Sequence, residues 1–244
     1  MTPLINVKDL KQTIGVKDLK QTIGKQKILN GLSFMLSAGE CLGLFGGRGA
    51  GKTTLLHILA GIDRFKSGSV EILGCDIRKS EAFKKRLGLI TQERSLFRDL
   101  RAYENLEFIA VLKGAGTENI TALVKRFELN NILGEPVNTL DAGVYQRLSM
   151  ACALLNKPRI LLADDLINDI DPRSQHIILR ELNSFISGGG SCIWSFSRIE
   201  FCRATGKVGW LENGTLSLYS PQEAQELWDS RLRLIEQQSG ENDA

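Results

Sequence analysis

Short apolar runs alternate with segments of helical period along most of the chain, starting at residue 41. The apolar runs are rich in β-formers and cover residues 41–45, 69–73, 87–90, 160–163 and 192–196. Helical periodicity marks residues 52–60, 101–113, 119–127, 146–155, 173–187 and 221–233. This alternation is typical of an α/β fold built on a largely parallel sheet.

The alternation is interrupted between residues 92 and 155, where the pattern is mostly helical. We therefore expect a helical subdomain at about 92–155, inserted into a core of about 1–91 and 156–220, within one domain that spans 1–244. A C-terminal helix should follow at about 221–237. Asn213 and Gly214 separate two short apolar runs, which is a strong hairpin signal, so an antiparallel β element should join the core.

A nine-residue stretch, VKDLKQTIG, occurs twice in tandem, at 7–15 and at 16–24. Two such copies do not predict a solenoid, whose units run to ~20 residues or more. We expect one copy to belong to the structure and the other to form an inserted loop or a spare edge strand.

Composition narrows the class without naming a partner. The 244 residues carry 31 Lys and Arg against 28 Asp and Glu, and this net charge of +3 is too slight to indicate nucleic acid, which we do not expect as a partner. The five cysteines include no C-x-x-C pair, which favours buried thiols in a reducing compartment over disulfides or zinc. No apolar run approaches the ~18 residues that a membrane span requires, so a membrane role would depend on a partner.

Between the run that ends at Phe45 and the helical segment after it, the chain fits the pattern G-x-x-x-x-G-K-S/T. Glycines allow successive backbone N–H groups to point inward, and the helix start adds a positive dipole end, a combination that binds polyphosphate. Lys52 would reach the β- and γ-phosphates and the Thr53 hydroxyl would hold Mg²⁺. The lysine, the threonine and both flanking elements disfavour the alternative, a glycine-rich turn without a ligand. The loop residues expected to bind ATP are Gly46, Gly47, Arg48, Gly49, Ala50, Gly51, Lys52, Thr53 and Thr54.

A second apolar run, at 160–163, ends in two acids, Asp164 and Asp165. In phosphate-loop proteins the first acid of such a strand reaches the magnesium ion. Any strand can end in an acid, so the pattern is weak alone. Together with the loop it predicts a magnesium site that contains Thr53 and Asp164.

Together these elements resemble the ATP-binding cassette (ABC) family of transporter ATPases over roughly residues 5–218. The resemblance implies a phosphate-loop NTPase with a mixed sheet. It places Gln92 where the family has a glutamine that senses the γ-phosphate, contributes to the metal site and couples to the membrane subunit. A polar loop after a strand explains Gln92 almost as well. Residues 140–154 hold the position of the family signature, usually LSGGQ, and residues 167–172 resemble its D-loop.

The resemblance is closest to the stand-alone ATPase subunits of bacterial exporters. It implies two partners, a membrane-spanning transporter subunit and a second ABC ATPase subunit of the same or another chain. In the family two subunits pair head to tail, and each ATP lies between the phosphate loop of one and the signature of the other. The expected location is peripheral, on the cytoplasmic side of the cell membrane.

Two catalytic positions depart from the family pattern. Asp165 replaces the catalytic glutamate and is one methylene shorter, and a base displaced by about 1 Å can lose on the order of a hundredfold in rate. Ser197 replaces the switch histidine and lacks the reach and the charge of imidazole. We therefore assign Asp165, Gln92 and Ser197 to a weak catalytic site.

Two binding positions depart as well. Asp141 replaces the signature serine; aspartate caps a helix as well as serine does, but its carboxylate would face the partner's nucleotide. Two like charges ~4 Å apart repel by about 4 kcal/mol at an effective dielectric constant of about 20, so we expect Asp141 to weaken closure on ATP. Gly143 is retained as a binding residue. The aromatic residue that stacks on adenine maps onto Ile14 or Ile23, neither of which has a π face.

The sequence therefore predicts a subunit that binds ATP and Mg²⁺ and hydrolyses ATP slowly or not at all. One function that fits is the ATP-binding subunit of an ABC transporter, coupled to a separate membrane-spanning subunit. The alternative is a nucleotide-dependent clamp that gates a partner without turnover.

Overall fold

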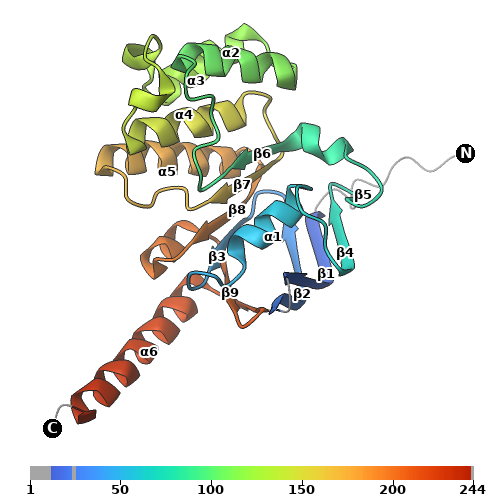
Figure 1. The fold of residues 1–244 in the computed structure, drawn as a ribbon, viewed down its shortest axis with the longest axis vertical. Helices are drawn as coiled ribbons and strands as arrows, with labels where there is room; N and C mark the ends of the chain where they lie inside the picture. The colour runs from blue at the N-terminus through green and yellow to red at the C-terminus, as the bar shows by residue number, and fades with distance from the viewer. Residues whose placement is uncertain (1–11, 24–25, 243–244) are drawn as a thin grey trace, which may run out of the picture.

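The computed structural model describes residues 12–23 and 26–242, whose strands form two sheets (Figure 1). The antiparallel sheet has the order β2-β1-β4-β5, and the mixed sheet has the order β10-β9-β3-β8-β7-β6. The strands of the antiparallel sheet are β1 (Gln12–Ile23), β2 (Gln26–Ser37), β4 (Ser67–Ile72) and β5 (Cys75–Asp76). Those of the mixed sheet are β3 (Cys41–Phe45), β6 (Leu87–Ile90), β7 (Ile160–Asp164), β8 (Ser191–Phe196), β9 (Lys207–Glu212) and β10 (Thr215–Tyr219).

Five neighbouring strands of the mixed sheet run parallel, from β9 through β3, β8 and β7 to β6. The carboxyl ends of β3, β7 and β8 therefore meet at one edge, where ligands bind in open α/β sheets. Strand β10 joins antiparallel through a hairpin. Its turn residues, Asn213 and Gly214, have φ angles of 50° and 74°, as a type I′ turn requires.

The antiparallel sheet corrects one prediction from the sequence. Residues 69–73 were expected in the parallel sheet, but β4 pairs antiparallel with β1 instead. The connection between β1 and β2 has only two residues, which is long enough for a hairpin and far too short for a parallel crossover. The hairpin gives β4 an edge to pair with before the chain continues to β6.

The tandem repeat falls on β1. Residues 7–11 of the first copy lie outside the described residues, while residues 12–15 begin the strand and the second copy continues it to Ile23. Ile14, Val16 and Leu19 are buried. Between the last two, Asp18 has a φ of 48° where the pairing shifts register. Strand β1 therefore contains the junction between the two copies.

Helix α1 (Lys52–Leu59) lies between the two sheets (Figure 1). Its apolar face, which includes Leu55, Leu56, Ile58 and Leu59, is buried in one core together with side chains from both sheets. This packing fixes the start of the helix at the carboxyl end of β3.

The remaining helices build a second core on the other side of the mixed sheet. Helices α2 (Ala102–Lys113), α3 (Thr117–Arg126) and α4 (Ala142–Leu154) follow one another between β6 and β7, and α4 packs on α5 (Pro172–Ser187). Helix α6 (Pro221–Asn242) projects from the body at the bottom of Figure 1, at the end opposite to α2, α3 and α4. Short 3-10 helices cover Ala82–Arg86, Asn130–Ile132, Val137–Thr139 and Ile199–Ala204. The predicted α/β fold with inserted helices and an antiparallel element is confirmed.

Four of the five cysteines are buried, Cys75 is half-buried, and all five are free thiols. Burial raises the pKa of the Cys152 thiol to about 12, which makes it inert at neutral pH. Across residues 12–23 and 26–242, no helix combines the length and the apolar character that a membrane crossing needs.

Candidate nucleotide-binding site

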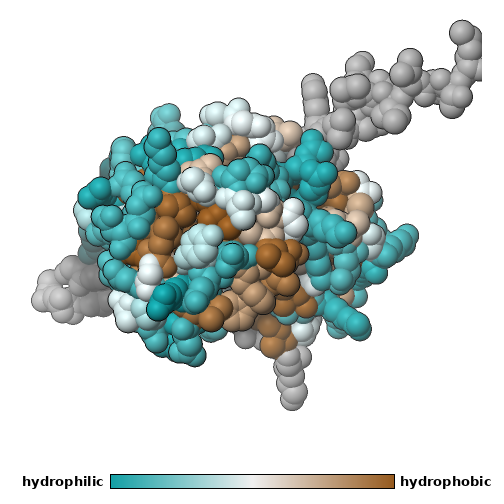
Figure 2. Space-filling view, turned by 90° about the horizontal axis from the view of Figure 1, so that it is seen from above, coloured by the Kyte–Doolittle hydropathy of each residue, from teal (hydrophilic) through white to brown (hydrophobic). Residues whose placement is uncertain are grey.

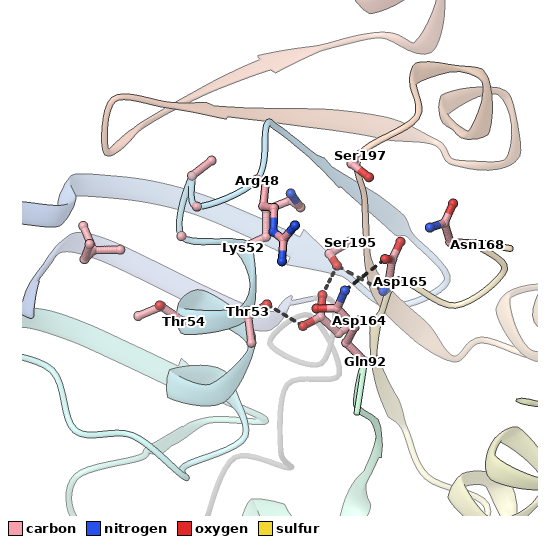
Figure 3. Close-up of a pocket in the computed structure, with 14 residues that line it drawn as sticks. Arg48, Lys52, Thr53, Thr54, Gln92, Asp164, Asp165, Asn168, Ser195 and Ser197 are labelled. Atoms are coloured by element: carbon pink, nitrogen blue, oxygen red, sulfur yellow. Dashed lines mark hydrogen bonds between the residues drawn. The ribbon is translucent and has the colours of Figure 1, made fainter. Parts of the chain in front are cut away.

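The phosphate loop connects β3 to α1 at the edge where the parallel strands end (Figure 3). The loop turns tightly, because Gly49 has a φ of 79° and Gly51 a φ of 102°, in the region that glycine adopts without strain. Gly51 also precedes α1, and no side chain caps this helix start. The first N–H groups of α1 are therefore not occupied by a side-chain cap, which is the arrangement that an anion site requires.

Lys52 points across the loop. Its Nζ donates hydrogen bonds to the carbonyl oxygens of Gly46, at 2.6 Å, and Gly47, at 3.0 Å. Burial lowers the pKa of Lys52, and the charges of Asp164 and Asp165 oppose that shift. A polyphosphate at the loop would replace these neutral carbonyl oxygens with charged phosphate oxygens. Charged oxygens are stronger hydrogen-bond acceptors for an ammonium group.

Asp164 lies between the loop and β8. The Thr53 hydroxyl donates to Asp164 Oδ2 at 2.6 Å, and the Ser195 hydroxyl donates to Oδ1 (Figure 3). Asp164 is buried. A hydroxyl and a carboxylate so close together are the hard oxygen ligands that Mg²⁺ prefers, so the donor set fits that ion.

Asp165 is the next residue and adopts a left-handed φ of 57°. Burial raises the pKa of its carboxyl, and the charges of Asp164 and Asp169 add to the rise, while Lys52 opposes it. The Gln92 amide donates to Asp165 Oδ2 at 3.4 Å, although the two residues are 73 positions apart. The structure thus brings together the residues that the sequence assigned to catalysis on one chain.

These side chains line a single cavity of about 460 Å³, in the range of small-ligand sites. Its lining includes Ser197, as the sequence predicts for the catalytic site. The full lining is Ile28, Arg48, Gly49, Ala50, Gly51, Lys52, Thr53, Thr54, Gln92, Asp164, Asp165, Asn168, Ser195 and Ser197. Of the loop residues predicted to bind ATP, Gly46 and Gly47 provide the two carbonyls that hold Lys52.

Asp141 and Gly143 do not line this cavity. The carboxylate of Asp141 caps α4 by accepting a hydrogen bond from Val144 N at 2.8 Å. Gly143 is buried where α4 meets α5, and a Cβ there would overlap Asp171 Oδ2 and the Ser174 side chain. A binding role for these two residues needs a second subunit and stays a prediction, whereas the packing of Gly143 explains its identity within one chain.

Burial distinguishes the two isoleucines that the sequence offers beside adenine. Ile14 is fully buried in the antiparallel sheet, so its assignment as the residue beside adenine is wrong. Ile23 is 56% exposed at the end of β1 and remains the candidate. Ile28, on β2, lines the cavity itself and was not singled out from the sequence.

Sequence analysis missed Ser195 and Asn168, both of which line the cavity. A signal for Ser195 was present, because residues 195 and 197 are two apart at the end of β8 and alternate side chains of a strand face the same way. Asn168 lies in the segment that resembles the family D-loop, where no single residue was picked out.

The glycine-rich loop, its lysine and threonine, and the acid strand beside them define a phosphate-loop nucleotide-binding protein. Residues 29–168 match the model of the ABC transporter family, and the chain belongs to this family. Its sequence is 30% identical to the lantibiotic transport ATP-binding protein SrtF of Streptococcus pyogenes over 186 residues, which are 76% of each chain. It is 34% identical to the Nod factor export ATP-binding protein I of Burkholderia lata over 167 residues, and spans 55% of that protein.

Solved structures agree on the fold. An ATP-binding subunit of an ABC transporter superposes with a TM-score of 0.80 at 22% identity, over 89% of this chain and 93% of that one. A dimeric cassette bound to ADP and Pi gives a TM-score of 0.79 at 22% identity, over 85% and 98%. The family match and these relatives make the chain an ATP-binding subunit of the ABC transporter family.

Proposed function

We propose that the cavity beside Lys52 binds ATP together with Mg²⁺, and that this subunit drives a separate membrane-spanning exporter subunit from the cytoplasmic side of the membrane with slow hydrolysis. The observation that carries the proposal is the convergence of an uncapped helix start, a half-buried lysine and a hydroxyl–carboxylate pair on one cavity. Thr53, Asp164 and Gln92 would hold the metal, whose charge would neutralise that of the phosphate oxygens when bound.

Slow hydrolysis is supported by the groups that would handle the proton of the attacking water. Asp165 would accept that proton, and Gln92 would orient the carboxylate through the hydrogen bond it already donates. The side chain of Asp165 is one methylene shorter than a glutamate, and Ser197 extends less far into the cavity than an imidazole would. Both changes would hold the reacting groups farther from the γ-phosphate, and a small displacement there lowers the rate steeply.

An exposed apolar patch on α2 supports the position of the membrane subunit. Phe108 packs edge-on against Phe97, with ring centroids 4.8 Å apart, and Val111 and Leu112 are 75% and 69% exposed. Figure 2 looks down on the side where α2 lies in Figure 1, and hydrophobic areas interrupt the hydrophilic surface there. Gln92 and Phe97 lie in the same connection between β6 and α2, so this connection joins the cavity to the patch along the chain. Such patches mark interaction sites.

Phosphate release at steady state tests the proposal. The wild-type chain should turn over slowly, and the double variant Asp165→Glu with Ser197→His should release phosphate at least about tenfold faster, because both groups regain their reach. Asp169→Glu is a matched control that lengthens an exposed acid nearby. A wild type that turns over rapidly and gains nothing from the double variant would contradict slow hydrolysis.

The alternative function is a clamp that gates its partner by binding ATP alone. It is favoured by the same two departures from the family pattern, Asp165 in place of glutamate and Ser197 in place of histidine, because both weaken hydrolysis. It predicts tight nucleotide binding with no phosphate release in the presence of the membrane subunit. Turnover stimulated by that subunit would exclude the clamp.

A further inference from the structure

We infer that Ser195 is a positioning residue, which fixes both acids of the cavity and thereby sets the affinity for the nucleotide-bound metal; the inference rests on the proposed function. Ser195 is fully buried and lies directly opposite Asp164 in the parallel pairing of β7 with β8. This register brings the serine side chain to the end of the acid strand.

The first contact restrains Asp164. The Ser195 hydroxyl donates to Oδ1, while Thr53 donates to Oδ2, so each carboxylate oxygen has its own partner. Rotation of the carboxylate would break both hydrogen bonds. With Oδ1 occupied on the β8 side, the oxygen on the side of the phosphate loop is Oδ2, the one that faces the Thr53 hydroxyl.

The second contact restrains Asp165. Its backbone N–H donates to the Ser195 carbonyl at 3.1 Å and lies 3.3 Å from the Ser195 hydroxyl. Asp165 has a left-handed φ of 57°, which a non-glycine residue keeps only when its surroundings hold it there. One serine therefore supports the conformation of both acids.

Ser195 is also the residue of β8 whose side chain contacts both acids. Ser197, two residues farther on, lines the cavity but is exposed, and among the described residues its side chain makes no hydrogen bond. In this chain the link from β8 to the metal-facing carboxylate runs through the hydroxyl of residue 195. Partners that orient a metal ligand typically change metal affinity by about 10- to 100-fold when removed.

A magnesium titration tests the inference. A fluorescent ATP analogue is bound to the protein, and its affinity is measured against free Mg²⁺ concentration and again in excess chelator. Ser195→Ala should raise the half-saturating Mg²⁺ concentration about tenfold, while the affinity measured in chelator changes less than about twofold. If the alanine variant does not fold, Ser195→Cys, which keeps the size of the side chain, replaces it. It should also raise the half-saturating Mg²⁺ concentration.

Ser191→Ala is the matched control. Ser191 is also a fully buried serine on β8, and its hydroxyl donates to the Ser37 carbonyl at 2.9 Å, away from the acids. The Ser191→Ala variant should lower the melting temperature about as much as Ser195→Ala does. Its half-saturating Mg²⁺ concentration should equal that of the wild type. Equal magnesium curves for the wild type and the Ser195 variants would overturn the inference. A wild type that binds no nucleotide with Mg²⁺ would instead refute the proposed function.

Discussion

Two helix starts in this molecule use the same backbone chemistry in opposite ways. Each α-helix begins with N–H groups that have no partner within the helix and with the positive end of the helix dipole. At α1 the preceding residue is Gly51, no side chain caps the helix, and the N–H groups face the cavity. At α4 the preceding residue is Asp141, whose carboxylate already occupies the helix start. The first helix start is open to an external anion and the second carries its own.

The comparison of α1 with α4 distinguishes nucleotide binding by one subunit from closure of two subunits on that nucleotide. Asp171 caps helix α5 in the same way, accepting a hydrogen bond from Ser174 N at 2.9 Å, so an acidic cap occurs twice in this fold. Hydrogen bonds from Ser174 hold the pKa of Asp171 below its usual value. The cap at α4 stabilises the helix in one chain, but in a head-to-tail pair it would confront the partner's nucleotide. A cap at residue 141 serves the stability of the subunit, whereas the negative charge of this cap would oppose closure of the pair.

The largest expected effect is the loss of nucleotide affinity when the lysine at the start of α1 is removed. Lys52→Ala should weaken nucleotide binding at least about a hundredfold, or about 2.7 kcal/mol, because the cation facing the phosphates and both acids is lost. Fluorescent-nucleotide titration measures the change, and Lys125→Ala on α3 is a control at an exposed lysine. Retained affinity in the Lys52 variant would show that α1 is not the anion site.

The next effect tests what holds α4 in place. Gly143→Ala should lower the free energy of unfolding by about 1–3 kcal/mol, because the added methyl overlaps Asp171 and Ser174 on α5. Urea unfolding measures the loss. Ala142→Gly, at the exposed neighbouring position, should cost about 1 kcal/mol at most. If Gly143→Ala leaves stability unchanged but impairs dimerisation, the glycine serves the nucleotide rather than the packing.

Removing the carboxylate at α4 should make the two helix starts alike. Asp141→Ser should tighten ATP-dependent dimerisation about tenfold, since a carboxylate near the partner's phosphates is lost. The stability of the single chain should change by less than about 0.5 kcal/mol, because serine caps as well as aspartate. Sedimentation with a hydrolysis-resistant ATP analogue measures the dimer. Unchanged dimerisation would refute the role of Asp141 as a resident anion.

The smallest effect concerns pH and the acids near α1. The pKa of Asp165 is raised in the folded chain, so its contribution to stability is complete below the unfolded value of about 3.8 and is lost as the pH rises through the folded value. Asp165→Asn should therefore be more stable than the wild type at neutral pH, and the difference should shrink at acidic pH. Melting temperatures between pH 4 and 7 measure it. A constant difference across that range would contradict the raised pKa.

Contacts that a known motif implies were predictable from the sequence, and contacts without a motif were not. The phosphate loop, Asp164 and Gln92 meet at one cavity although they are far apart in the sequence, because each motif ends a strand of the same parallel sheet. The packing of Gly143 on α5 could not be inferred, since nothing in residues 140–154 reveals which helix lies beside them. Ile14 and Ile23 occupy equivalent places in two identical copies, and burial is what distinguishes them.

The identity of those two copies affects how the chain tolerates a change in length. Strand β1 places Ile14, Val16 and Leu19 in the core, and Ile5, Val7 and Leu10 stand at the same intervals nine residues earlier. Loss of nine residues leaves the same protein whichever copy is removed, and the shortened chain still offers isoleucine, valine and leucine in the order that the sheet requires. Gene variants that gain or lose one unit should therefore keep a working fold. After a loss, proline, leucine and asparagine stand in place of Gln12, Thr13 and Gly15, and the rest of the strand is unchanged.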